Sequence, residues 1–166
     1  INIQNILLLL LEKKMIKILC VGKIKEKFFT EGICEYQKRI DAYTKFSIVE
    51  VKEVNTLDIN KNITEEGRNL LSKISEDEFV ITLEIKGKMI DSVELARLIE
   101  EKMTYGFSKI TFVIGGSNGL SSDVIKRSNY HLSFSEFTFP HQLMRLVLIE
   151  QIYRALTIIN NKEYHK

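Results

Sequence analysis

The residues best suited to chemistry lie in the last third of the chain, in two turns rich in glycine or hydroxyl side chains. One apolar run ends in Gly-Gly-Ser-Asn-Gly at 115–119, and the next leads into 134–140, which mixes hydroxyl and aromatic residues. Such loops, at the ends of neighbouring strands of an α/β sheet, form a pocket that reads a flat polar ligand through main-chain groups. The first turn matches neither the dinucleotide pattern G-x-G-x-x-G nor a P-loop, so phosphate binding is disfavoured.

Each of these turns has two interpretations. Gly115, Gly116 and Gly119 either serve only tight turn geometry or let the main chain touch an adenosine. Ser135 and Thr138 either satisfy the loop backbone and cap the helix that follows, or belong to a loop whose main chain surrounds the ligand.

Imidazole and charged side chains follow on the helical pattern 141–159, which opens directly after the only proline. His141 and Arg145 are one turn apart on the same face, and Arg145 could bind a phosphate or a carboxylate. The ordinary alternative for His141 is a surface or capping residue. Glu150 and Arg154 form a second i, i+4 pair, which favours an ion pair of about 0.3 kcal/mol.

Four short motifs occur in a fixed order: Ile114-Gly-Gly-Ser-Asn-Gly, Leu132-Ser-Phe-Ser-x-x-Thr-x-Pro-His-Gln, Glu150-Gln-Ile-Tyr-Arg-Ala and terminal Tyr164-His165-Lys166. Together they resemble the RlmH branch of the SPOUT methyltransferases, over residues 15–166. Members of that branch methylate N3 of a pseudouridine in large-subunit ribosomal RNA with S-adenosylmethionine. The resemblance implies a homodimer and a C-terminal trefoil knot that holds the cofactor, although connection rules alone would disfavour a knot.

The resemblance also implies a cofactor site built from three segments, each ending a strand. The residues concerned are Leu83, Gly115, Gly116, Gly119, Phe134, Ser135, Glu136, Phe137, Thr138, Phe139 and Pro140. No metal is expected, because three histidines and two cysteines are too scattered to form a metal site.

The catalytic residues implied by the resemblance combine the last helix with the chain end, which would reach the active site across the dimer. They are His141, Arg145, Arg154, Tyr164, His165 and Lys166. The Tyr164 ring could stack on an extruded base, and Lys166 can make a charge contact with phosphate, though not a bidentate one. The N3–H proton must leave before methyl transfer, and His141, His165 or water is the candidate base.

Two other functions stay open. One is a non-catalytic module of the same fold that binds RNA or the ribosome. The other is a methyltransferase acting on another base or on transfer RNA. Cofactor binding separates the first from the enzymes, and mapping of modified bases separates the two enzymes.

Short apolar runs alternate with helical patterns, which predicts an α/β fold with a mostly parallel sheet covered on both faces. Strands are predicted at 16–21, 46–51, 79–83, 110–114 and 130–134, and helices at 26–43, 65–74, 92–105, 123–128 and 141–159. Residues 55–62 are predicted to be a polar, mobile loop, with a helix start at Thr64. Asp91 and Glu94 predict a capping box.

The last helix, 141–159, is apolar on more than one side. A surface helix of a monomer needs only one apolar stripe, so the pattern favours a second partner besides the sheet. We therefore expect a homodimer interface along this helix, in agreement with the resemblance.

With 166 residues, 45% hydrophobic and 28% charged, the chain is predicted to be a soluble globular domain. Its net charge of +2 gives no strong electrostatic signature for RNA, so a large folded particle such as the ribosome would be recognised by shape. Cys20 and Cys34 are expected to be buried, reduced thiols in the cytoplasm, with a redox pair as the alternative.

Residues 1–14 precede the expected start of the fold at Met15. Their apolar run is too short for a membrane span and carries its lysines after the run rather than before it, unlike a signal peptide. We expect 1–14 to be an extension outside the native fold and 15–166 to be a single domain, with no membrane partner. The alternative is an amphipathic segment that covers a sheet edge.

Overall fold

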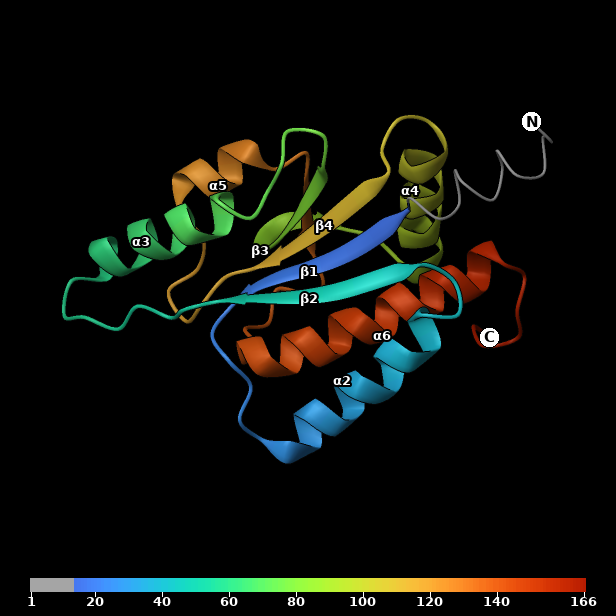
Figure 1. Ribbon diagram of the computed structural model, residues 1–166, viewed down its shortest axis with the longest axis horizontal. Coiled ribbons are helices and arrows are strands. Elements are labelled where there is room, and N and C mark those ends of the chain that lie inside the picture. Colours follow the sequence, from blue (N-terminus) through green and yellow to red (C-terminus); the bar gives the residue numbers. More distant parts are fainter. Residues whose placement is uncertain (1–13) are drawn as a thin grey trace.

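Residues 14–166 are described by the structure, a computed structural model. They form a five-stranded sheet in the order β2-β1-β4-β3-β5, in which every neighbouring pair is parallel (Figure 1). The elements in chain order are β1 (Met15–Val21), α2 (Lys27–Ile40), β2 (Lys45–Val51), α3 (Ile59–Leu71), β3 (Phe79–Met89), α4 (Ser92–Thr104), β4 (Lys109–Ile114), α5 (Ser122–Arg127), β5 (Tyr130–Ser133) and α6 (His141–Ile159). The predicted α/β fold is confirmed, and the trefoil knot stays a prediction. The extension predicted at 1–14 lies, apart from Lys14, outside the described residues.

Side chains that alternate along β1 supply both faces of the sheet. Ile16, Ile18 and Cys20 join the larger core beneath α2, α4 and α6, whereas Leu19 and Val21 join the smaller core beneath α3 and α5. Figure 1 shows α3 and α5 on one side of the strands and α2 and α6 on the other. The continuous apolar runs of the sequence are therefore explained by a sheet that is covered on both faces.

Helix α6 lies in the larger core, with α2 on one side and α4 on the other. Gly32 of α2 leaves room for Leu146, because a Cβ there would lie 3.0 Å from the leucine Cδ1. Ile152 is fully buried within a single chain. Much of the two-sided apolar pattern is thus accounted for by contacts within the chain. A charge at Ile152 would disrupt this core, so it cannot report on a dimer interface, which stays a prediction.

The segment predicted to be a mobile loop at 55–62 contains the start of α3. The Asp58 side chain accepts a hydrogen bond from Lys61 N at 3.1 Å and caps the helix. Asn62 is buried, and its side chain exchanges hydrogen bonds with the Thr56 main chain. Thr64 lies inside the helix, so the predicted helix start there is wrong. The capping box of Asp91 and Glu94 is confirmed.

Strand β3 continues six residues beyond its predicted end at Leu83. Leu83 and Lys88 both pair with Leu132 of β5, so residues 84–87 bulge out between them. A Cβ at Gly87 would lie 2.7 Å from the Leu132 carbonyl carbon, which restricts this position to glycine. The bulge forms one wall of the cavity described below.

The two cysteines differ in their surroundings. Cys20 is buried, and burial raises the pKa of its thiol to about 12, so it stays protonated. Cys34 is exposed on α2. The prediction of burial is therefore confirmed for Cys20 and wrong for Cys34.

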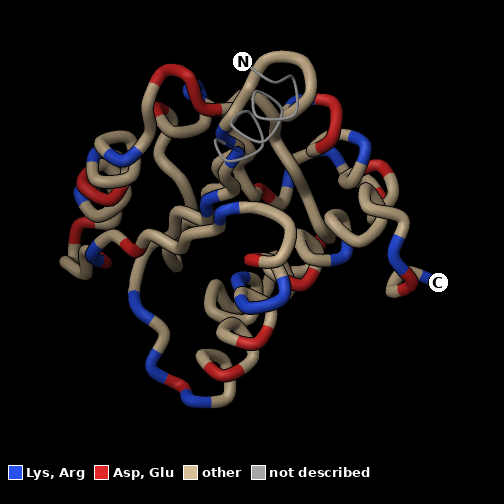
Figure 2. Tube along the Cα trace, turned by 45° about the vertical axis from the view of Figure 1, so that its right-hand side comes forward, with Lys and Arg blue, Asp and Glu red and all other residues tan. Residues whose placement is uncertain are grey.

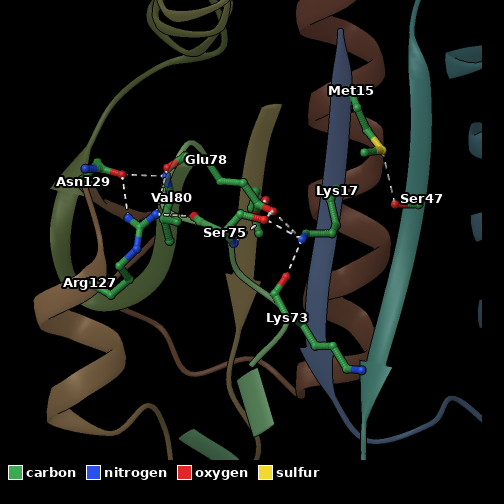
Figure 3. Close-up of polar contacts among 10 residues, drawn as sticks. Met15, Lys17, Ser47, Lys73, Ser75, Glu78, Val80, Arg127 and Asn129 are labelled. Atoms are coloured by element: carbon green, nitrogen blue, oxygen red, sulfur yellow. Dashed lines mark hydrogen bonds and ion pairs between the residues drawn. The ribbon is translucent and has the colours of Figure 1, made fainter. Parts of the chain in front are cut away.

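At the amino ends of the strands, the buried carboxylate of Glu78 joins three strands (Figure 3). Lys17 Nζ of β1 lies 3.1 and 3.0 Å from its two oxygens, and the Thr111 hydroxyl of β4 donates to it at 2.5 Å. The Ser75 main-chain N–H also donates to it. Burial alone would raise the pKa of Glu78, but these hydrogen bonds outweigh burial and hold the pKa below its usual value.

Candidate cofactor site

A cavity of about 740 Å³ lies at the carboxyl ends of β3, β4 and β5. All the cofactor residues expected from the sequence line it, except Glu136, which is exposed on the loop. His141 and Met144 at the start of α6 complete the wall. Three segments that are far apart in sequence therefore meet around one space: the bulge after Leu83, the turn 115–119 and the loop 134–140.

The turn after β4 closes on itself. Gly119 N–H donates to the Gly116 carbonyl at 3.1 Å, and Gly119 has φ +85°, a conformation that favours glycine. A Cβ at Gly115 would lie 2.9 Å from the main-chain carbonyl of Gly119. Turn geometry alone thus explains glycine at these two positions, as the first interpretation of the sequence held.

The need for glycine at position 116 has a different explanation. A Cβ there would lie 3.1 Å from Glu66 Oε2 of α3 and 3.1 Å from Val21 Cγ1. A side chain at this position would therefore meet protein atoms of α3 and β1. Gly116 nevertheless lines the cavity with its main chain.

The loop 134–140 is held by two serine hydroxyl groups, one at the end of β5 and one within the loop. The Ser133 hydroxyl lies 3.0 and 3.1 Å from the carbonyls of Ile85 and Ser135, which ties the loop to the β3 bulge. The Ser135 hydroxyl accepts from Phe137 N–H at 3.0 Å. Neither Ser135 nor Thr138 caps α6, because Pro140 occupies the N-cap position. The loop can therefore keep its shape without a ligand.

The bulge supplies cavity residues that sequence reasoning missed, namely Glu84, Ile85 and Lys86. The Glu84 carboxylate accepts from the Thr82 hydroxyl at 2.6 Å and pairs with His131. The alternation of apolar and charged residues past Leu83 is a strand signal that could have extended β3 and so revealed this wall.

The size and lining of the cavity suit a nucleoside-type cofactor. Small-molecule sites are commonly about 300–1,000 Å³, with apolar walls and a few polar main-chain groups. Leu83, Leu132 and Phe134 give apolar surface, and the turn 115–119 gives main-chain groups. At the rim, Phe137 is 78% exposed. The residues present therefore fit the cofactor implied by the resemblance.

His141 and Arg145 lie close in sequence, but only one of the two side chains is free to contact a ligand. His141 is half-buried and lines the cavity. Arg145 is only 3% exposed, and its guanidinium donates to Glu50 at 2.9 Å and to the Gly22 carbonyl at 3.0 Å. Arg145 thus fixes α6 against the ends of β1 and β2. In this placement its guanidinium is engaged by protein atoms and is not free for a phosphate.

The end of the chain, at Tyr164 and His165, packs against the C-terminal half of α6. Tyr164 donates to Glu150 at 3.1 Å, and its ring lies 4.7 Å from the Tyr153 ring. Arg154 lies 4.8 Å above the Tyr164 ring, pairs with Glu150 at 2.6 Å and approaches His165 at 3.3 Å. The predicted Glu150–Arg154 ion pair is confirmed. Burial, followed by hydrogen bonds, raises the pKa of the Tyr164 hydroxyl, so it stays protonated.

Helix α2 adds to this group of side chains, which we call the tail cluster: Tyr36, Arg39, Glu150, Tyr153, Arg154, Tyr164 and His165. Arg39 lies 5.4 and 5.7 Å from the ring centres of Tyr36 and Tyr153. From Met144 at the cavity to Arg154 in the cluster, α6 rises roughly 15 Å. Within one chain, the tail and the cavity are therefore apart. Tyr36 and Arg39 were missed, since nothing in their sequence spacing points to the chain end.

Charge is spread evenly over the described part of the molecule. Figure 2 shows lysine and arginine interleaved with aspartate and glutamate along the trace. Residues 14–166 bring together no group of three or more potential metal ligands. Among these same residues, no helix is long and apolar enough to cross a membrane.

Comparison with known proteins agrees with this architecture. A family model described as a predicted SPOUT methyltransferase matches residues 15–165. The chain therefore belongs to the SPOUT methyltransferase family, whose members in general use S-adenosylmethionine.

Two solved structures share the fold. A probable methylase family protein from Haemophilus influenzae Rd KW20 has a TM-score of 0.50 and 18% identity, over 94% of this chain and 71% of that one. A probable methyltransferase from Bordetella pertussis Tohama I has a TM-score of 0.54 and 9% identity, over 90% of this chain and 98% of that one. At such low identity the likeness supports the fold alone.

Proposed function

We propose that this protein methylates N3 of a pseudouridine in large-subunit ribosomal RNA, in the assembled ribosome, with S-adenosylmethionine as methyl donor. The observation that carries the proposal is the meeting of Leu83, the turn 115–119 and the loop 134–140 around one cavity. Two of the four sequence motifs contain this turn and this loop, and the resemblance adds Leu83. Family membership supports the methyl transfer, and the motifs support the choice of base.

The chain's own residues would hold the cofactor mainly through main chain and apolar contact. The turn 115–119 and the loop 134–140 would present N–H and C=O groups to the adenine and methionine parts, and Leu83 would pack against them. When bound, S-adenosylmethionine supplies an electrophilic methyl group on a sulfonium sulfur. Because Ser133 and Ser135 already fix the loop, little ordering is required on binding.

The uracil-type ring must give up its N3 proton before N3 can attack the methyl carbon in line. His141 lines the cavity at the start of α6, where its imidazole could receive that proton. Arg145, one turn later, would act indirectly, by holding α6 in place through Glu50 and Gly22. We therefore assign His141 as the candidate base and Arg145 as a positioning residue.

We further propose that the site is completed by the tail of a second copy in a homodimer. Tyr164, His165 and Lys166 lie at the other end of α6 from the cavity of their own chain. A partner's tail could place its aromatic ring on the target base and its cations on phosphate. Partly exposed apolar residues near the cavity, Leu143, Met144 and Phe139, are available for such an interface.

The test is transfer of labelled methyl groups from S-adenosylmethionine to ribosomes taken from a strain that lacks the gene. Ribosomes, free ribosomal RNA and transfer RNA are compared as substrates. We expect labelling of the ribosome alone. Labelling of transfer RNA would favour the other enzyme, and a protein that binds ribosomes but no cofactor would be a binding module.

A further inference from the structure

One buried charge beside the cavity has no role in the proposed chemistry. Glu66 of α3 is 3% exposed. Its Oε1 accepts from Val54 N–H at 2.9 Å, but its Oε2 has no hydrogen-bond partner among the described residues. A buried carboxylate oxygen without a partner costs stability, so its presence calls for a function.

Glu66 lies directly behind the turn after β4. A Cβ on Gly116 would meet Oε2 at 3.1 Å and Oε1 at 3.5 Å, so the carboxylate faces the α-carbon of a residue that also lines the cavity. The next residue, Gly67, packs even more closely against Ser121, the N-cap of α5 just after the turn, where a Cβ would lie 2.2 Å from the serine hydroxyl. Helix α3 is therefore pressed against the turn, with the Glu66 carboxylate next to the cavity wall.

No lysine or arginine of the described residues forms an ion pair with Glu66 within 4.0 Å. The titratable groups that influence it are Glu53, after β2, and His141, at the start of α6. Burial is the main cause that raises the pKa of Glu66, and the negative Glu53 adds to it, whereas the Val54 hydrogen bond and His141 oppose it. Among residues 14–166, the carboxylate thus has no lysine or arginine that neutralises it.

We propose that Glu66 determines cofactor specificity, by making the cavity bind a positively charged cofactor more tightly than its neutral product. This inference rests on the proposed function. In methyl transfer the S–CH₃ bond breaks and the N3–CH₃ bond forms, while the N3 proton passes to the base. The sulfonium becomes a neutral thioether, so the ligand in the cavity loses one positive charge.

An unpaired carboxylate next to the cavity wall attracts the sulfonium and ammonium groups of the substrate form. It attracts the product less, because the product retains only the ammonium. A unit charge beside the cavity wall, partly screened by solvent, changes the binding constant of a charged ligand by roughly three- to tenfold. Glu66 would therefore favour entry of the charged form and release of the spent one, without touching either.

A purely structural role predicts something different. If Glu66 only supports the turn through Val54 and Gly116, its loss would weaken both ligands by the same factor. The ratio of the two dissociation constants therefore separates an electrostatic role from a supporting one.

The experiment is titration calorimetry with S-adenosylmethionine and S-adenosylhomocysteine on the wild-type protein and on Glu66→Gln. Glutamine keeps the size of the side chain and removes only the charge. Glu65→Gln, at the neighbouring and more exposed residue of α3, is the matched control. We expect Glu66→Gln to lower the preference for S-adenosylmethionine by roughly three- to tenfold, and Glu65→Gln to leave it unchanged.

An unchanged ratio in Glu66→Gln would overturn the inference while leaving the proposed function intact. Failure of the wild-type protein to bind either ligand would instead overturn the proposed function. Should Glu66→Gln not fold, the wild-type protein still decides the matter with sinefungin, which carries an amine in place of the sulfonium. Tighter binding of sinefungin than of S-adenosylhomocysteine supports the inference, and equal binding contradicts it.

Discussion

Glu78 and Glu66 are buried to the same extent, each 3% exposed, but they lie at opposite ends of the sheet. At the amino ends, Glu78 is bonded to Lys17, Thr111 and Ser75, and its pKa is lowered. At the carboxyl ends, Glu66 has one oxygen with no hydrogen-bond partner in the described part of the chain, and its pKa is raised. A buried charge whose partners are all supplied by the chain stabilises the fold, whereas one left incomplete points to a ligand.

The same contrast holds along α6, which runs from the carboxyl ends of the strands toward their amino ends (Figure 1). Its first turn lines the cavity, while its last turns carry the tail cluster, in which Tyr164 and Arg154 are bonded to Glu150. By these contacts, the last turns of α6, near the amino ends of the strands, have a structural role. The tail residues packed against them are nevertheless the ones expected to contact RNA. The predictions below test whether the two ends differ as described.

The largest effect is expected at Glu78, at the amino ends of the strands. Glu78→Ala leaves Lys17, which is 13% exposed, without its partner and should lower the free energy of unfolding by about 3 kcal/mol. Urea denaturation measures this change, with Glu76→Ala, on the exposed loop before β3, as the control.

The pH dependence of that loss gives a second check. The pKa of Glu78 is below 4.5 in the folded protein, so its stabilisation is present above pH 4.5 and is lost as the pH falls through the lowered pKa. The gap between wild type and Glu78→Ala should therefore narrow on acidification. A gap independent of pH would contradict the assigned ion pair.

The next effect concerns the tail. Removal of residues 164–166 should spare cofactor binding but reduce methyl transfer to ribosomes by roughly 100-fold, about 2.7 kcal/mol in transition-state stabilisation. Lys162→Ala, just before the tail, is the control. Full activity in the shortened protein would show that the tail cluster is structural only.

A mixed dimer tests whether the tail acts on the other copy. One subunit lacks residues 164–166, and the other carries Gly119→Val, which impairs the cavity. If tail and cavity come from different chains, the mixed dimer regains about half of its sites. If they come from the same chain, each of the two sites carries one defect, and mixing the subunits restores no site.

A smaller effect is expected at the turn itself. Gly119→Val forces a β-branched residue into φ +85° and should weaken S-adenosylmethionine binding by about tenfold, with a stability loss of about 1–2 kcal/mol. Calorimetry and circular dichroism measure the two changes. This variant is preferable to Gly116→Val, which would displace Glu66. Unchanged affinity would remove the turn from the cofactor site.

The smallest effect is expected at Glu66, where removing the charge should raise the free energy of unfolding and not lower it. The pKa of Glu66 is raised above 4.5 in the folded protein, so its ionisation destabilises the fold as the pH rises through the raised pKa. Glu66→Gln should therefore be slightly more stable than wild type at neutral pH, with the difference vanishing below pH 4.5. Thermal melts across this range should show the opposite trend to Glu78→Ala. Parallel trends would mean that the two glutamates are equivalent.

Features encoded locally were predictable from the sequence. Helix α6 has its predicted bounds, because a proline precedes it and a long apolar run fills it. The turn 115–119 and the loop 134–140 were found, because glycine and hydroxyl residues mark them and strands place both at one edge of the sheet.

Features created by distant contacts were not predictable. Glu66 and Glu78 appear in sequence as ordinary surface glutamates, and only the packing of Gly116 and Thr111 against them reveals two different roles. Arg145 shares a helix face with His141, but its pairing with Glu50 depends on a strand almost a hundred residues away. The start of α3 was missed because Asn62, a polar residue, is buried by contacts with its own loop.

The most direct test of the central claim is mass mapping of large-subunit ribosomal RNA from wild-type, deletion and complemented strains. We predict that one N3-methylated pseudouridine disappears on deletion, returns fully with the wild-type gene and returns to a lower level with Gly119→Val. An unchanged methylation pattern in the deletion strain, or a loss confined to another base, would contradict the proposed function.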